Sequence, residues 1–396
     1  MTDLVYNPYD YAMHEDPYPT YARLREEAPL YRNGERNFWA LSRHADVMAA
    51  FRDPAHFSNR DGVSLDPAAS GPNAYRTMSF LAMDPPRHDR MRALVSRGFT
   101  PGRVAGLEPR IRELARLHLV PALERGAFDF VGDFAGKLPM DVICELMGVP
   151  PADRDEMRRL ADLLVHREEG VFDVPPAGLD AALTLAGYYD EMLVERRRRP
   201  TDDLTSALLE AELDGDRLTA DEIIGFLFLV VVAGNETTTK LLANAWYWAW
   251  CNPDERAKPF ADAARIPDWI EETLRYDTST QMLARTAVED FELHGGCIPA
   301  GGRVVLLLGA ANRDARVFPS PDRYDLDRDT SASASFGAGR HFCLGAPLAR
   351  LESRVAFEEL TAQVSDYDID TDGMARVHSV NVRGFSTLPT TVERTR

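Results

Sequence analysis

The sequence has few cysteines and fewer basic than acidic residues, and each shortage excludes a class of protein. None of its four cysteines forms a C-x-x-C pair, and their spacing indicates neither a disulfide framework nor a zinc site. Lysine and arginine number 45 against 63 acidic residues, a formal net charge of -18, so we expect no nucleic-acid partner. A reducing compartment fits the cysteine usage. These cysteines are Cys144, Cys251, Cys297 and Cys343.

Targeting signals and membrane-spanning runs are also lacking. The longest apolar run, 223–233, is too short to cross a bilayer, and polar residues follow it. The N-terminal stretch shows neither the basic nor the apolar region of a signal peptide. We therefore expect a cytoplasmic protein with no membrane attachment, and we expect it to be a monomer.

The periodicity predicts a mainly α protein with small β-sheets, organised as a single helical domain over 1–396. Hydrophobic residues make up 45% and charged residues 27%, and no repeat or long linker divides the chain. Thr219 and Glu222 form a capping box that opens a long central helix to about Trp250. At 1.5 Å per residue it would be roughly 45 Å long, and its apolar sides predict burial.

Other elements are expected on both sides of this helix. Asp84 is predicted to cap a helix over 87–97, and the stretch 58–82 before it reads as a long loop. The remaining expectations are helices over 18–27, 44–52, 267–276 and 344–364, with strands over 38–41, 281–308 and near 386–389.

A glycine-rich loop over 335–350 is the most distinctive stretch, because it presents Cys343 ahead of an amphipathic segment. Glycines let the backbone pass close to whatever the sulfur binds, and a thiolate needs electropositive surroundings or a metal. Judged by residue type alone, a lone cysteine is more often a small buried hydrophobe. A dinucleotide-binding loop does not fit, because Phe342 stands where the third glycine is required and no strand precedes the loop.

The pattern F-G-x-G-x-H-x-C-x-G in this loop resembles the haem-binding loop of the cytochrome P450 monooxygenases in their soluble bacterial form. The resemblance implies the cytochrome P450 fold and a haem b cofactor, with the Cys343 thiolate as the proximal ligand of iron. It further implies that the haem is contacted by Phe336, Gly337, Arg340, His341 and Gly345.

A second unusual stretch, A-G-N-E-T-T over 233–238, interrupts the helical pattern of the long helix. Glycine costs about 1 kcal/mol there relative to alanine, and threonine hydroxyls can bond back to carbonyls one turn earlier and bend a helix. Taken alone, these residues fit a kinked core helix as well as a functional groove. The resemblance implies that Ala233 and Gly234 border the O2 site of a widened, broken helix, and that Glu236 and Thr237 relay protons there.

Glu272 and Arg275 lie on one face of their helix, at i,i+3 spacing. Taken alone, they suggest an exposed ion pair. The resemblance implies instead a buried network that supports the cysteine loop and includes a third arginine, Arg323, in the segment P-D-R-Y over 321–324.

Four cations match positions that bind haem propionates in this family, namely His88, Arg92, Arg285 and His341. Individually, each would more often be an ordinary surface cation. As a set, they would supply the charge-assisted hydrogen bonds that two carboxylates need.

The resemblance implies a monooxygenase that inserts one atom of O2 into a C–H or C=C bond of a lipophilic small molecule. No flavin or iron–sulfur motif is present, so electrons from NAD(P)H would arrive through a separate ferredoxin or flavodoxin and its reductase. The substrate class stays open among steroids, macrolides or polyketides, terpenoids and fatty acyl groups of secondary metabolism. The substrate pocket is expected from 61–80, 163–183, the apolar run through Val230, 278–283 and 381–385.

Three alternatives remain at this point. An H2O2-driven peroxygenase would not need Glu236 and Thr237, and peroxygenases of this fold typically lack the pair. A non-enzymatic haem sensor would usually carry an output domain, which the sequence does not show. A variant of the fold that performs C–C coupling or dehydration also fits.

Overall fold

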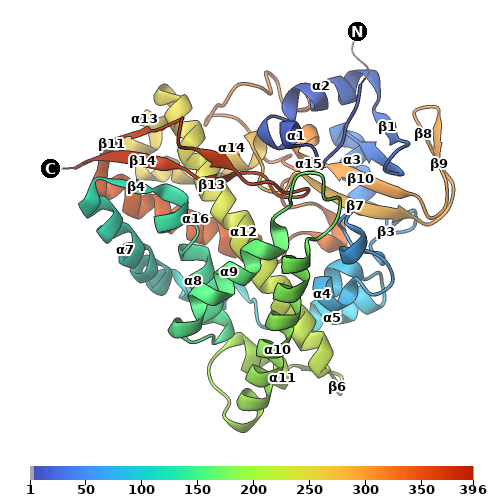
Figure 1. Cartoon of the computed structure of the whole chain (residues 1–396), viewed down its shortest axis with the longest axis horizontal. Coiled ribbons are helices and arrows are strands. Elements are labelled where there is room, and N and C mark those ends of the chain that lie inside the picture. Colours follow the sequence, from blue (N-terminus) through green and yellow to red (C-terminus); the bar gives the residue numbers. More distant parts are fainter. Residues whose placement is uncertain (1–3, 396) are drawn as a thin grey trace.

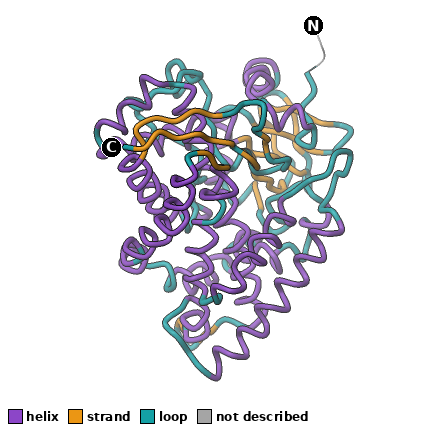
Figure 2. Tube along the Cα trace, turned by 60° about the vertical axis from the view of Figure 1, so that its left-hand side comes forward, coloured by secondary structure: helices purple, strands orange, loops and turns teal. Residues whose placement is uncertain are grey.

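A computed structural model of the chain describes residues 4–395, and its helices dominate the molecule (Figures 1 and 2). The first three residues of the stretch without signal-peptide features lie outside the described part. The helices are α1 (Tyr11–Glu15), α2 (Tyr18–Glu27), α3 (His44–Arg52), α4 (Tyr75–Met78), α5 (Arg87–Ser96), α6 (Pro101–Gly106), α7 (Glu108–Arg125), α8 (Leu138–Met147), α9 (Arg154–Val165), α10 (Pro176–Arg198), α11 (Leu204–Glu210), α12 (Ala220–Cys251), α13 (Pro253–Ala261), α14 (Ile266–Tyr276), α15 (Leu308–Ala311) and α16 (Ala346–Gln363).

Most of the strands lie in the upper half of the molecule as drawn in Figure 2, and one short strand pair lies near its lower end, beside α11 (Figure 1). They are β1 (Leu30–Asn33), β2 (Phe38–Leu41), β3 (Phe57–Ser58), β4 (Ala127–Asp129), β5 (Glu212–Leu213), β6 (Asp216–Arg217), β7 (Met282–Ala287), β8 (Phe291–Leu293), β9 (Gly296–Ile298), β10 (Arg303–Leu307), β11 (Val364–Ile369), β12 (Ala375–Arg376), β13 (Phe385–Thr387) and β14 (Pro389–Arg394). The predicted mainly helical fold with small sheets is confirmed.

The largest sheet has the strand order β1-β2-β10-β7-β3. β10 pairs antiparallel with β7, where Val304 lies opposite Arg285, and parallel with β2. A second sheet has the order β11-β14-β4 and joins the C-terminal strands to the segment after α7. The larger sheet therefore fixes the position of Arg285, one of the four residues expected to bind propionates.

The central helix α12 begins as the capping box predicts. The backbone N–H of Thr219 donates to Glu222 Oε2 at 3.0 Å, and the N–H of Glu222 donates to Thr219 Oγ1 at 3.2 Å. Within residues 4–395, α12 is the one helix long and apolar enough to cross a membrane, but 78% of its most apolar window is buried inside the protein. Its hydrophobicity is therefore that of a core helix.

Aromatic stacking holds the C-terminal half of α12 in the core. The rings of Trp246 and Tyr367 stack with centroids 3.5 Å apart, and Phe130 stacks on the other side of Trp246 at 5.0 Å. The Tyr367 hydroxyl donates to the Trp246 carbonyl at 2.7 Å. These contacts join α12 to β11 and to the segment after β4, so the helix is anchored well away from its functional stretch.

The segment before α5 differs from the sequence-based expectation. The stretch 58–82 includes the short helix α4, so it is not wholly irregular. Asp84 does not cap α5, because its carboxylate accepts hydrogen bonds from the Asn59 backbone N–H at 2.8 Å and from the Ser58 hydroxyl. The prediction of Asp84 as the N-cap is therefore wrong. Its side chain closes the loop that borders the site instead.

Candidate active site

The cysteine loop depends on two glycines with backbone angles in the left-handed region. Gly337 has φ of +68° and Gly339 has φ of +67°, a conformation that most residues with a Cβ avoid. A Cβ on Gly339 would also lie 2.9 Å from the Phe51 carbonyl oxygen of α3. The backbone N–H of Cys343 donates to the Phe336 carbonyl at 3.0 Å. The loop is thereby folded back tightly enough to direct Cys343 into a cavity.

Two opposing effects act on the pKa of the Cys343 thiol. Burial raises the pKa of the Cys343 thiol, while the backbone N–H groups of Gly345 and Ala346 and the charges of Arg92 and Arg350 lower that pKa. The two N–H groups belong to the N-terminal end of α16, where unpaired backbone donors stabilise negative charge. This is the arrangement expected for a cysteine that becomes a thiolate when a metal binds it.

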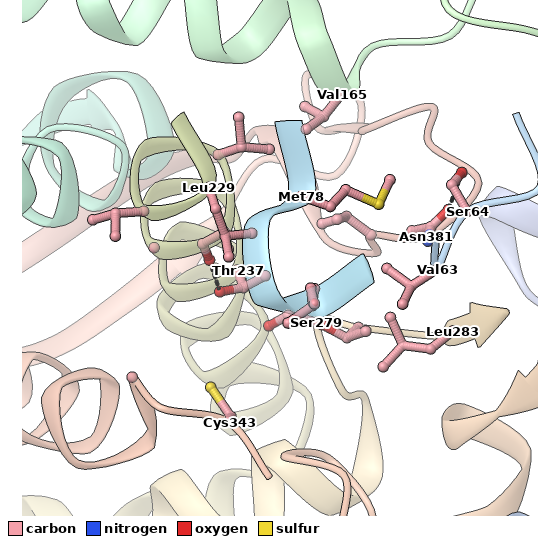
Figure 3. Close-up of a pocket in the computed structure, with 18 of the residues that line it drawn as sticks. Val63, Ser64, Met78, Val165, Leu229, Thr237, Ser279, Leu283, Cys343 and Asn381 are labelled. Carbon is pink, nitrogen blue, oxygen red and sulfur yellow. Dashed lines mark hydrogen bonds between the residues drawn. The ribbon is translucent and has the colours of Figure 1, made fainter. Parts of the chain in front are cut away.

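A predominantly apolar cavity of about 440 Å³ lies between Cys343 and α12. Cys343 borders it from the loop, and Ala233, Gly234 and Thr237 border it from α12. Figure 3 shows Leu229 and Thr237 on the same helix, with Cys343 below them. Other lining residues come from each segment predicted to form the substrate pocket, for example Val63, Val165, Ser279 and Val382.

The functional stretch of α12 keeps its helical backbone. The Thr237 hydroxyl donates to the Ala233 carbonyl at 2.7 Å, which is the back-bond that the sequence suggested. The helix is nevertheless continuous from Ala220 to Cys251, so the expectation of a broken helix is wrong. Gly234 has a packing role, because a Cβ there would lie 2.7 Å from Ile143 Cδ1 of α8.

Glu236 is almost fully buried and lies among charged groups. Its Oε2 is 3.2 Å from Nζ of Lys240, one turn later on α12. Enclosure by surrounding atoms and a hydrogen bond to Glu236 raise the pKa of Asp162, on α9, to about 8, although part of the Asp162 surface stays open to solvent. The Asp162 carboxyl therefore holds its proton to a higher pH than an ordinary aspartate does.

Several histidine and arginine side chains near Cys343 have buried nitrogen atoms without hydrogen-bond partners in the described chain. The rings of His88 and His341 lie 4.1 Å apart. Within the described chain, no hydrogen-bond partner exists for His88 Nε2, His341 Nδ1 or Arg92 Nη1, all of which are buried. Arg285 is 2% exposed, and its recorded hydrogen bond is to the carbonyl of its neighbour Ala284.

The electrostatic consequence of this cation cluster is large. Burial, His88, Arg285 and Arg92 together lower the pKa of His341 to about 2. Burial and the neighbouring Arg303 lower the pKa of Arg285 to about 10. A group that carries two carboxylates would relieve this excess of positive charge and satisfy the unpaired nitrogens. The donor set therefore fits the propionates of a haem whose iron is bound by Cys343.

Arg340 differs from the other expected haem contacts. Its side chain is 55% exposed, and Nη1 donates to Asp89 Oδ2 at 2.6 Å. The same carboxylate contacts His88 Nδ1 through its other oxygen, at 3.0 Å. Arg340 thus helps to fix Asp89 and His88. Arg340 does not border the cavity, and neither do His88, Arg92 and Arg285.

The network behind the cysteine loop contains a different third arginine from the one expected. Arg275 forms a bidentate pair with Glu272, at 2.6 and 2.7 Å, and both side chains are fully buried. The side chain of Arg323 is 67% exposed and lies 3.9 Å from Asp325. Arg328, which is 7% exposed, lies 3.5 Å from Glu272 Oε1. The expected position of Arg323 in the network is therefore wrong, because Arg328 occupies it.

Three acidic residues near the cavity were not found from the sequence. Asp162 and Asp66 lie in segments without a recognisable motif, so no signal pointed to either one. Glu352, one helical turn or more beyond the cysteine loop on α16, borders the cavity, and burial raises its pKa well above the usual range. Helical phase with Leu348 could have placed Glu352 on the buried face of α16.

Comparison with known proteins agrees with this site. The protein-family model described as "Cytochrome P450" matches residues 266–372, which include Glu272, Arg275 and Cys343. The chain is 59% identical over 392 residues to "Putative cytochrome P450 123" of Mycobacterium tuberculosis, covering 99% of this chain and 98% of that protein. It is 40% identical over 386 residues to the "Vitamin D(3) 25-hydroxylase" of Pseudonocardia autotrophica, covering 96% and 94% of the two chains.

A solved structure agrees over the whole length as well. The structure of cytochrome P450 CYP109Q5 from Chondromyces apiculatus superimposes with a TM-score of 0.89 at 36% sequence identity. The superposition covers 98% of this chain and 98% of that one.

Proposed function

The chain belongs to the cytochrome P450 family and is a monooxygenase, and from this premise we propose how its own residues perform the reaction. Cys343 binds the haem iron from the loop side, and His88, Arg92, Arg285 and His341 bind the propionates. One observation carries this assignment. Buried histidine and arginine nitrogens without hydrogen-bond partners in the described chain cluster beside a cysteine that borders an apolar cavity.

The haem would supply the activation of O2 and the insertion of one oxygen atom into the substrate, driven by the electron donation of its thiolate ligand. Phe336, Gly337 and Gly345 shape the loop so that the sulfur stays close to the N–H donors of α16. The apolar walls exclude water from the reacting groups. The protein itself positions the sulfur, supplies charged and N–H groups around it, and keeps water away from the reacting groups.

Proton delivery is assigned to Asp162, Glu236 and Thr237. Asp162 is partly open to solvent, and interaction with Glu236 contributes to raising its pKa to about 8. Thr237 is the neighbour of Glu236 on α12 and presents its hydroxyl beside the cavity. A proton would therefore pass from Asp162 to Glu236 and be offered at the Thr237 hydroxyl, as general acid catalysis requires.

The substrate is proposed to be a lipophilic small molecule. The cavity walls are mostly aliphatic side chains such as Leu229 and Leu283 (Figure 3). The relative from Pseudonocardia, named as a vitamin D(3) hydroxylase, acts on a molecule of that kind. We favour hydroxylation of a C–H bond, with electrons from NAD(P)H through a ferredoxin or flavodoxin. The assignment of 1–396 to one domain stays a prediction.

The peroxygenase alternative is disfavoured by the same residues. A peroxide already carries the protons and electrons that the relay would supply, so a buried pair of carboxyl groups beside the cavity would have no task. Turnover with H2O2 alone, compared with turnover through a ferredoxin and its reductase, separates the two reactions. Faster turnover with H2O2 alone would reverse our assignment.

Spectroscopy of the reduced, CO-bound protein tests the iron ligand directly. The wild type should show the red-shifted Soret band of a thiolate-bound haem, and Cys343→Ala should lose it. Cys144→Ala is the control, because Cys144 is buried on α8 and does not border the cavity, so the band should be unchanged. An unshifted band in the wild type would contradict the proposed function.

A further inference from the structure

One part of the cavity wall carries polar groups that the chemistry at Cys343 does not use. Figure 3 shows Ser64 and Asn381 next to each other and well apart from Cys343. The same part of the wall includes Asp66 and Arg167. The cavity is otherwise mostly apolar, so a polar group on a bound substrate would be attracted to this wall.

Asp66 and Arg167 neutralise each other. Arg167 lies between α9 and α10 and is 7% exposed, while Asp66 is 1% exposed. The guanidinium donates to both Asp66 oxygens, at 2.6 and 3.3 Å, and Nη1 donates to the carbonyls of Leu164 and His166, at 3.1 and 2.8 Å. Arg167 therefore has almost no hydrogen-bonding capacity left, and its charge is not available to a substrate.

The Asp66 carboxylate is equally engaged. It also accepts hydrogen bonds from the Ser64 hydroxyl at 2.7 Å and the Tyr9 hydroxyl at 3.2 Å. A substrate carboxylate near this wall would meet a buried carboxylate and a guanidinium that is already paired. It would lose its hydration without gaining a partner, which is costly for a charged group.

Asn381, in contrast, has hydrogen-bonding capacity to spare. Its backbone is held in place, because its carbonyl accepts from the Gln281 N–H at 2.8 Å. Its side-chain amide has two long contacts, Oδ1 at 3.4 Å from Ser64 Oγ and Nδ2 at 3.5 Å from the Met282 carbonyl. Hydrogen bonds of an amide normally lie near 2.9 Å. The single hydroxyl hydrogen of Ser64 is already donated to Asp66.

Exchanging the positions of Oδ1 and Nδ2 in the Asn381 amide does not give it better hydrogen bonds. Nδ2 would then face Ser64 Oγ, but Oδ1 would face the Met282 carbonyl, and two acceptors repel each other. In either orientation, a donor or an acceptor beside the cavity is left without a good partner. A neutral hydroxyl or carbonyl group is the chemistry that would complete it.

We propose that Asn381 determines specificity by binding a neutral hydroxyl or carbonyl group of an otherwise apolar substrate, while the Asp66–Arg167 pair rejects carboxylates. This inference rests on the proposed function, because it takes the cavity as the substrate site. It narrows the substrate class to neutral alcohols and ketones and disfavours free fatty acids. It also places the oxidised carbon at the end of the substrate away from that polar group.

Four probes that share one skeleton test this proposal with the haem-loaded protein. They are androstane, androstanol, androstanone and an androstane carboxylic acid, titrated by the high-spin shift of the haem spectrum. We expect the alcohol and the ketone to bind up to about tenfold more tightly than androstane, the value of one well-made hydrogen bond. Asn381→Leu, which keeps the branched shape and the number of side-chain heavy atoms, should remove this preference while androstane binding is retained.

Two further variants serve as comparisons for Asn381→Leu. Thr77→Val removes another hydroxyl from the cavity wall but leaves Asn381 in place, so the preference for alcohol should persist. Ser279→Ala removes a buried hydroxyl for which residues 4–395 offer no partner. If Ser279→Ala abolishes the preference and Asn381→Leu does not, Ser279 is the anchor and the proposal is overturned.

A gain of function tests the role of the ion pair. Asp66→Asn removes the negative charge but keeps a hydrogen-bonding side chain, so the charge of Arg167 becomes available. Affinity for the carboxylic acid should rise about tenfold or more, and Arg167→Gln in the Asp66→Asn background should cancel the rise. Equal binding of the acid before and after Asp66→Asn would contradict the rejection of carboxylates.

Failure here is distinguishable from failure of the proposed function. The reduced, CO-bound spectrum of each sample reports whether Cys343 binds the haem. A red-shifted band together with equal affinities for androstane and androstanol overturns only the role of Asn381. Thermal-shift titrations with the same probes give the affinity ratios where a bound probe leaves the spectrum unchanged. Tightest wild-type binding of the carboxylic acid in either assay also overturns the proposal.

Discussion

Arg328 Nε lies 3.5 Å from Glu272 Oε1, and this contact adds a third buried charge to the Glu272–Arg275 pair. Arg328 also donates through Nη1 to the Pro319 carbonyl at 2.5 Å and through Nη2 to the Ser320 carbonyl at 3.0 Å. These bonds join α14 to the segment that leads into the cysteine loop. The loop that carries Cys343, the proposed haem ligand, is therefore supported from behind by a charged network inside the protein.

Removing Arg328 should weaken that support strongly. Arg328→Ala leaves Glu272 with less compensation in a buried site, a change that costs about 3–5 kcal/mol when a buried pair is broken. Arg323→Ala, at an exposed position five residues earlier, should cost less than about 1 kcal/mol. Urea unfolding of both haem-loaded variants measures the difference. Equal losses of stability would show that the network does not depend on Arg328.

Thr237 should govern how much of the consumed NAD(P)H appears as product. Thr237→Val keeps the shape of the side chain but removes the hydroxyl, so protons reach O2 less reliably and H2O2 is released instead. We expect a drop of about tenfold or more in coupling, within the range of general acid catalysis. Thr237→Ser, which retains a hydroxyl, should restore most of the coupling. A fully coupled Thr237→Val enzyme would remove Thr237 from the relay.

Asp162 should give product formation a dependence on alkaline pH. Its pKa is raised to about 8, so the proton that it supplies is present below that pH and is lost above it. Coupled turnover of the wild type should fall as the pH rises through about 8. Asp162→Asn cannot release a proton, so its coupling should be low and flat across this range.

Asp155→Asn is the matched control for Asp162. Asp155 lies two turns earlier on α9, and its carboxylate pairs with Arg158 at 2.9 Å on the exposed side. We expect this variant to keep the wild-type pH profile. A profile for Asp162→Asn that matches the wild type would assign the alkaline limb to another group.

His14 should make the protein less stable in mild acid. Burial lowers the pKa of His14 to about 4, and Arg383 and His378 also oppose its charged form. In the unfolded chain His14 titrates near 6.5, so the unfolded state binds the proton first and stability is lost as the pH falls from 6.5 towards 4.

The size of this effect can be measured by urea unfolding. Between about pH 7 and about pH 5, the contribution of His14 amounts to a loss of about 2 kcal/mol. His14→Gln keeps a donor for the Pro8 carbonyl, which His14 Nε2 contacts at 2.9 Å. Between about pH 7 and about pH 5, the free energy of unfolding of this variant should therefore fall by about 2 kcal/mol less than that of the wild type. Identical losses in the two proteins would show that His14 does not titrate as described.

The parts of the site that depend on local sequence were predicted correctly. Glycines at 337 and 339 are needed for positive φ angles, and the motif around Cys343 contains them. The capping box at Thr219 defines the start of α12 because both of its hydrogen bonds lie within four residues. The strands over 281–308 and the helix over 267–276 followed from periodicity, which reflects burial on one face.

Other parts were decided only by the tertiary structure. Arg323 and Arg328 are five residues apart in an irregular segment, and the turn between them decides which side chain reaches Glu272. Asp162 meets Glu236 because α9 packs across α12. Asp66 and Arg167 form an ion pair although they are 101 residues apart in the sequence.

Sequence alone thus determined the family and the approximate boundaries of the main helices, because short-range hydrogen bonds and backbone angles depend on neighbouring residues. The assignment of Cys343 as the iron ligand stays a prediction. The folded chain decided which charges are paired and which are left free. A buried charge finds its partner by proximity in space, and long-range packing sets that proximity. The pairing at Asp66 and the spare capacity at Asn381 both depend on it.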